Sequence, residues 1–115
     1  MSIRYIGPGP RLSEATVANG FVFLSGMVPE NGSADATEQT RDVLAQIDHW
    51  LAQCRSDKNH LLEATIFLAD MADYDGMNAV WDAWIPDGHA PTRACVQARL
   101  ANPAWRVEMA VTAAL

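Results

Sequence analysis

Three side chains near the C-terminal end have types and spacing that suit small-molecule chemistry: Arg93, Cys95 and Glu108. They lie in two runs that alternate between apolar and polar residues, 90–97 and 106–111, as strands with one apolar face do. If the two runs pair directly as a hairpin, Arg93 falls opposite Glu108, and a guanidinium, a thiol and a carboxylate share one patch of sheet. A β-bulge would change this register.

Such a patch could bind a small carboxylate and move a proton on it. Arg93 offers a planar fork that matches a carboxylate with two hydrogen bonds, and Glu108 can hold or activate a water as general base. The alternative is a surface ion pair across two strands, which would stabilise the fold by about 0–1 kcal/mol and do no chemistry. The alternative for Cys95 is a buried, inert thiol.

Composition and charge exclude several classes of function. The chain has 115 residues, of which half are hydrophobic and 19% charged, as in one soluble globular domain spanning 1–115. Its net charge is −6 and its eight basic residues are scattered, which argues against a nucleic-acid partner. No apolar run is long enough to cross a membrane and no signal-peptide pattern is visible, so we expect a cytoplasmic protein.

The cysteines and histidines do not form a metal site. Cys54 closes the apolar stripe of a predicted helix and is expected to fill the core, and both cysteines are expected to be free thiols. His49, His60 and His89 have no metal-ligand spacing. We therefore assign no metal.

The elements that must position the three side chains begin with an irregular arm. Residues 1–13 contain Gly7-Pro8-Gly9-Pro10, a density of Pro and Gly that predicts no regular structure. Asn19-Gly20 lies between the apolar runs 15–18 and 21–24, which is the strongest short signal for a β-hairpin.

Two helices and a strand follow. Apolar residues at helical spacing predict a helix from Asp35 to Cys54, begun by an Asp35 cap, and a second helix begun by Asp73 or Asp75 and ended by 86–88. Residues 61–69 are predicted to form a strand. Its apolar face would carry Leu62, Ala64, Ile66 and Leu68.

The resulting order, ββαβαββ, predicts an α+β two-layer sandwich: a mixed sheet with two helices on one face. Phe21, Phe23 and Phe67 would leave the other face apolar. Because monomers rarely expose such a face, we expect a homo-oligomer, with the Arg93 and Glu108 patch at or near a subunit interface.

Several motifs resemble the Rid (YjgF-like) family, most closely its YoaB-like branch. The resemblance runs from about residue 12 to the end and includes a Pro-x-Arg-x-Cys-Val run with a Glu fifteen residues after the Arg. The segments that carry it are 24–29, 64–70, 77–81, 90–96 and 107–108.

This resemblance implies a chorismate-mutase-like fold and a homotrimer with sites between subunits. It implies hydrolysis of 2-imino acids, tautomers of 2-enamino acids, to 2-keto acids and ammonia without a cofactor. Arg93 would hold the substrate carboxylate, Cys95 would border the imine nitrogen mostly through its backbone, and Glu108 would activate water. Residues implied to line or support the cleft are Ser25, Gly26 and Asn78. Taken alone, Ser25 and Asn78 could equally satisfy neighbouring backbone.

One departure from the family concerns the N-terminal arm, where RidA-like members carry a Tyr that reaches the ligand. That position falls near Ser13, beside Arg11 and Leu12, while Tyr5 lies too early. A trimer that only binds small carboxylates such as 2-keto acids is therefore a second hypothesis. RNA cleavage, a third, is disfavoured by the acidic charge and by the lack of a His-centred acid–base pair near Arg93. The expected partners are a small 2-imino or 2-keto acid and other copies of the chain.

Overall fold

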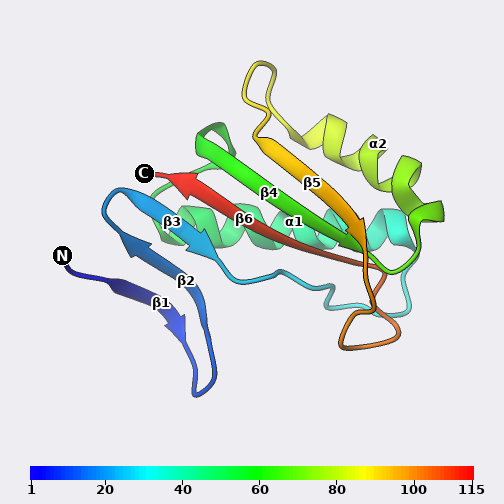
Figure 1. Cartoon of the computed structure of the whole chain (residues 1–115), viewed down its shortest axis with the longest axis horizontal. Coiled ribbons are helices and arrows are strands. Elements are labelled where there is room, and N and C mark those ends of the chain that lie inside the picture. The colour runs from blue at the N-terminus through cyan, green and yellow to red at the C-terminus, as the bar shows by residue number, and fades with distance from the viewer.

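The computed structural model describes all 115 residues and contains one six-stranded sheet and two helices (Figure 1). The elements in chain order are β1 (Arg4–Pro8), β2 (Ser13–Ala18), β3 (Phe21–Leu24), α1 (Ala36–Gln53), β4 (Leu61–Leu68), α2 (Tyr74–Trp84), β5 (Thr92–Gln97) and β6 (Val107–Ala114). Two 3₁₀ turns, η1 (Lys58–His60) and η2 (Met71–Asp73), precede β4 and α2.

The strands follow the spatial order β1-β2-β3-β6-β4-β5. Only β4 and β5 run parallel, and all other neighbours are antiparallel. In Figure 1, α1 lies behind β3, β6 and β4, and α2 lies beside β5. The predicted α+β two-layer sandwich, with a mixed sheet and both helices on one face, is confirmed.

Neither helix has the length and apolar character needed to cross a membrane.

The prediction of an irregular arm over 1–13 is wrong for its first part. Residues 4–8 form β1, which pairs antiparallel with β2 and places Tyr5 opposite Thr16. An edge strand needs ladder hydrogen bonds on one side only, so it tolerates Pro8 at its end and Gly7 in a left-handed conformation (φ 59°). The element order is therefore βββαβαββ.

Local signals placed the hairpin and the first helix correctly. Asn19 (φ 54°) and Gly20 (φ 83°) both have positive φ, as a two-residue turn between β2 and β3 requires. At the start of α1, the Asp35 side chain accepts a hydrogen bond from the Glu38 N–H (2.9 Å), so the predicted cap is confirmed. Cys54 is fully buried in the core, as predicted.

The core lies between the sheet and the helices. Fully buried side chains of α1 pack there against alternate residues of the strands, including Val22, Ile66 and Met109. The members of α1 in this cluster are Val43, Leu44, Ile47 and Leu51. Leu62 was predicted to join this face, but an irregularity between Leu61 and Glu63 turns it outward, and the prediction is wrong for this residue.

The other face of the sheet carries no helix. Phe21 and Phe23 point to it and are 42% and 47% exposed. The molecule measures only 20 Å along its shortest axis, which is the thickness of one sheet and one helix layer. The predicted uncovered apolar face is therefore present in the single chain.

Candidate functional site

The condition for Arg93 and Glu108 to share one patch of sheet, direct pairing of their strands, is not met, because β4 lies between β5 and β6. Arg93 is level with Ala64 of β4, which is level with Val111 of β6, and both of these are buried on the helix side. Glu108 is level with Phe67, on the uncovered side. Since neighbours in register point to the same face, Arg93 and Glu108 lie on opposite faces of the sheet.

The Arg93 guanidinium rests on α2. Its Nη1 donates to Oδ1 of Asn78 (2.8 Å) and its Nη2 to the hydroxyl of Tyr74 (3.3 Å). Its Cζ lies 5.3 Å from the centre of the Trp81 ring and 5.9 Å from that of Tyr74. The three helix residues are spaced i, i+4 and i+7, so they share one face of α2.

All of these partners are neutral, and no carboxylate pairs with Arg93 in the chain. A half-buried guanidinium with a fixed position and an uncompensated charge is suited to bind a small anion. Tyr74 and Trp81 were not predicted as parts of this site. Their helical spacing from Asn78 is the signal that could have found them.

Cys95 lies on the same strand and the same face as Arg93, level with Ile66 of β4. Burial raises the pKa of the Cys95 thiol above its ordinary value, and the nearby Arg93 charge offsets part of that rise. The thiol is therefore protonated at neutral pH and a poor nucleophile. The low nucleophilicity of the thiol favours a role for Cys95 through its backbone groups.

The Glu108 carboxylate lies directly over Gly26. A Cβ built on Gly26 would overlap Oε2 of Glu108 and lie 3.1 Å from its Cδ. Two backbone hydrogen bonds between Met27 and Met109, of 2.7 and 3.1 Å, hold the segment after β3 against β6. Only glycine, which has no side chain, leaves room at position 26 for the Glu108 carboxylate.

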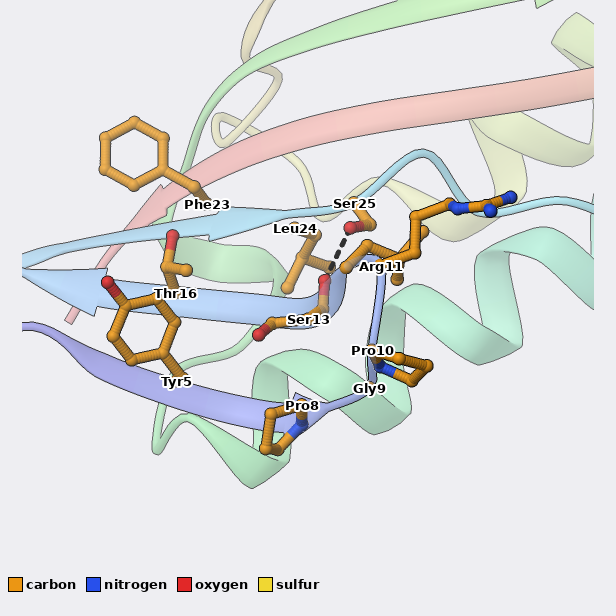
Figure 2. A pocket seen from close by; sticks show the side chains of 11 residues that line it. Tyr5, Pro8, Gly9, Pro10, Arg11, Ser13, Thr16, Phe23, Leu24 and Ser25 are labelled. Carbon is orange, nitrogen blue, oxygen red and sulfur yellow. Dashed lines mark hydrogen bonds between the residues drawn. The ribbon is translucent and has the colours of Figure 1, made fainter.

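Beside Ser25 is a hollow of about 590 Å³, formed by β1, the turn after it and the ends of β2 and β3 (Figure 2). Figure 2 shows Tyr5, Thr16 and Phe23 following one another across the three strands, and Arg11 extending past Ser25 on the side away from Tyr5. The Ser25 hydroxyl donates to the carbonyl of Ser13 (2.6 Å), so its proton satisfies backbone.

The six predicted site residues thus form two groups of three. Arg93, Cys95 and Asn78 lie together at the β5 and α2 edge, and the other group, on the uncovered side by β3 and β6, contains Ser25, Gly26 and Glu108. A small hollow of about 240 Å³ is lined by Arg93, but no hollow is lined by both Arg93 and Glu108. One chain alone does not bring the two groups together.

Comparison with known proteins establishes the family. Residues 4–115 match the family described as endoribonuclease L-PSP, and the chain belongs to this family, also called YjgF or Rid. It is similar to the RutC family protein YoaB of Escherichia coli, with 48% identity over 115 residues and all of both chains covered. The resemblance found in the sequence is confirmed.

Two further similarities bear on fold and activity. The crystal structure of a YjgF-family protein from Neisseria meningitidis is 65% identical, with a TM-score of 0.96 over 99% of this chain and 95% of that one. The 3-aminoacrylate deaminase RutC of Acinetobacter baylyi is 37% identical over 105 residues, covering 86% of this chain and 82% of that protein. The family therefore includes a deaminase.

Proposed function

We propose that this protein hydrolyses 2-imino acids, and the 2-enamino acids that tautomerise to them, to 2-keto acids and ammonia. The observation that carries the proposal is the Arg93 guanidinium, half-buried and held by neutral groups of α2 with no acidic partner. Such a group is placed to bind the carboxylate that these substrates share. A relative described as a 3-aminoacrylate deaminase, which acts on an enamine carrying a carboxylate, supports the reaction class.

The proposed site needs a second subunit. Arg93 and Glu108 lie on opposite faces of one sheet, so a substrate bound to Arg93 would meet a Glu108 only from another copy of the chain. The uncovered apolar face that carries Phe21 and Phe23 gives the copies a surface on which to associate. We propose a homotrimer with one cleft at each interface, as the resemblance implies.

In this cleft Arg93 would anchor the carboxylate and leave the imine carbon exposed to one water. Glu108 would take a proton from that water as its oxygen bonds to the carbon, and the C=N electron pair would move to the nitrogen, which takes this proton to give a carbinolamine. Glu108 would then take the hydroxyl proton as the carbonyl forms and the C–N bond breaks, and deliver it to the nitrogen, so one imino acid and one water give one keto acid and one ammonia. The imine carbon is already electrophilic, so the site mainly supplies position.

A trimer that only binds 2-keto acids is the second candidate. The observation that favours it is that the N-terminal turn, residues 11–13, is Arg-Leu-Ser and supplies no phenol, although Tyr5 of β1 lines the same hollow as Ser25. Without that group, the cleft could bind the carboxylate and yet fail to orient the imine.

The test is the removal of Arg93. 2-Iminopropanoate is generated in situ by an amino-acid oxidase, and its conversion to keto acid is followed for the wild type, Arg93→Met and Arg41→Met. A lost Arg–carboxylate contact costs about 2–5 kcal/mol, so Arg93→Met should reduce kcat/KM by about thirtyfold or more. Arg41, which is exposed on α1 and paired with Glu38, is the matched control and should keep the full rate.

The two candidates give different results. If the wild type does not accelerate hydrolysis, but pyruvate raises its Tm and Arg93→Met abolishes that rise, the protein binds keto acids without catalysis. A wild-type rate in Arg93→Met would overturn the role of Arg93 in hydrolysis. An unchanged rise in Tm with pyruvate in the same variant would overturn its role in binding.

A further inference from the structure

We propose that the Tyr74 hydroxyl is a second carboxylate-binding group, which donates a hydrogen bond to the ligand held by Arg93. This inference rests on the proposed function and adds to it a residue that fixes the preference for a carboxylate. It starts from the contact between the Arg93 guanidinium and the first residue of α2.

The direction of that contact leaves the phenol proton free. A guanidinium has only donors, so the Tyr74 oxygen accepts from Nη2 of Arg93 (3.3 Å). A phenol also has one proton to donate, and no group of the chain accepts it. With 36% of its surface exposed, Tyr74 can present this proton to a bound molecule.

The neighbouring groups select an anion as that molecule. Arg93 uses one N–H on Asn78 and one on Tyr74, which leaves three of its five N–H groups for a ligand. A carboxylate has two oxygens that accept about four hydrogen bonds, more than one side of the guanidinium supplies. A carboxylate on the free side of Nη2 lies beside the phenol, and an O–H to an ionised oxygen is one of the stronger hydrogen bonds.

The position of Tyr74 is fixed independently of any ligand. The preceding residue, Asp73, pairs with Arg106, with distances of 2.9 Å to Nε and 2.8 Å to Nη2. The Tyr74 ring also lies 5.9 Å from Cζ of Arg93, a packing contact that survives removal of the hydroxyl. Tyr74→Phe therefore removes the O–H donor and keeps the contact of the ring with Arg93.

The experiment compares steady-state kinetics with 2-iminopropanoate for the wild type, Tyr74→Phe and Trp84→Phe. Tyr74→Phe should raise KM about tenfold, the cost of one hydrogen bond to a charged group, with kcat unchanged because the carboxylate is bound equally in ground and transition states. The Kd of pyruvate should rise by the same factor. Trp84→Phe is the control on α2, because it removes the hydrogen bond to Asp48 and keeps an aromatic ring against Trp81, so the Arg93 cluster stays in place.

A merely positioning role for Tyr74 is tested by the Arg93 Nε–H resonance of the ligand-free protein. It should keep its chemical shift and width in Tyr74→Phe. A displaced or broadened resonance together with weaker binding would mean that Tyr74 acts only by holding the guanidinium, and would overturn the direct contact.

Other outcomes separate this inference from the proposed function. If Arg93→Met loses activity while KM and the pyruvate Kd of Tyr74→Phe match the wild type, the proposed function stands and the Tyr74 inference fails. It also fails if the rise in KM occurs in Tyr5→Phe instead, because Tyr5 is the only other tyrosine. If the wild type neither hydrolyses the imine nor binds pyruvate, both are overturned.

Discussion

Gly26 is the residue on which the placement of the Glu108 carboxylate depends. A methyl group at this position would overlap the end of a flexible side chain, and the Gly26 backbone is not left-handed. Gly26→Ala should therefore move the carboxylate rather than unfold the protein. Since a shift of about 1 Å in a catalytic group can cost about a hundredfold in rate, we expect a fall of that order in kcat with little change in Tm.

The matched control for this substitution is Gly76→Ala. A Cβ on Gly76 of α2 would lie 3.5 Å from Oγ1 of Thr37, which is ordinary contact, and Ala favours a helix. Gly76→Ala should keep the wild-type rate, with a Tm equal to or above that of the wild type. If Gly26→Ala is as active as the wild type, the reaction does not depend on the position that the Glu108 carboxylate has over Gly26.

Cys95 should show the reactivity of a protonated thiol. Burial raises its pKa, so the folded protein holds this proton at a pH where an ordinary thiol has lost it. Alkylation of Cys95 by iodoacetamide, followed by mass spectrometry from pH 6 to 11, should be slow at neutral pH and accelerate only above the ordinary thiol range. In Arg93→Met the acceleration should move to still higher pH, because the charge that offsets burial is gone. Fast alkylation at pH 7 would contradict this.

The same pKa shift has a consequence for stability. Burial also raises the pKa of Cys54, and Arg4 offsets part of that rise, so the folded protein binds more thiol protons than the unfolded chain. This contribution is fully present below the ordinary thiol pKa and is lost as pH rises through the raised values.

At the scale of elements, Gln39 joins α1 to the strand that carries Glu108. Its side chain is fully buried, and its Nε2 donates to the carbonyls of Ala34 (3.1 Å) and Ala104 (3.0 Å). Its Oε1 accepts from the backbone N–H of Arg106 (2.7 Å), just before β6 begins. The bonds to Ala104 and Arg106 fix where β6 enters the sheet, and the bond to Ala34 ties them to the start of α1.

Gln39→Leu fills the same space and breaks all three bonds. It leaves two carbonyls and one N–H, all of exposed or half-buried residues at the edge of the core, without these partners, so we expect a loss of about 1–3 kcal/mol in the free energy of unfolding. Urea unfolding at fixed protein concentration measures this. Gln53→Leu, at the exposed end of the same helix, should stay within about 0.5 kcal/mol of the wild type. Equal midpoints would mean that the three bonds contribute little.

Elements coded by neighbouring residues could be predicted from the sequence, and contacts between distant strands could not. Asn19-Gly20 and Asp35 act within a few residues, so the hairpin and the start of α1 were correct. The alternation around Arg93 and Glu108 shows which residues share a face, but not that β4 inserts between the two strands. Leu62 was misplaced because a bulge leaves no mark in the alternation.

The candidate site was predictable to a similar extent. The resemblance named residues of both groups, but nothing local in the sequence indicates that they lie on opposite faces. For Tyr74 the one sequence signal is its helical spacing from Asn78, because its contact with Arg93 joins a helix to a strand 19 residues further along.

At the scale of the whole molecule, the chain is a two-layer sandwich with one uncovered sheet face, called the bare face below. It is 20 Å thick, its helices cover one face of the sheet, and the other face exposes Phe21 and Phe23. Arg93 lies toward the covered side and Glu108 toward the bare face. Association of the bare face of one copy with the β5 and α2 edge of the next would both bury the apolar surface and let the two groups of site residues meet between subunits.

Phe23→Glu tests this assembly, because it places a carboxylate on the bare face of every copy and an unpaired charge is costly to bury. We expect the wild type to sediment with a mass near that of three 12.5 kDa chains and Phe23→Glu near that of one. The variant should also lose activity, although the contacts of Arg93 with α2 lie within one chain. Met71→Glu, which charges a residue 40% exposed on η2, should keep both mass and activity. A fully active monomer would show that one chain completes the site and that the bare face has another use.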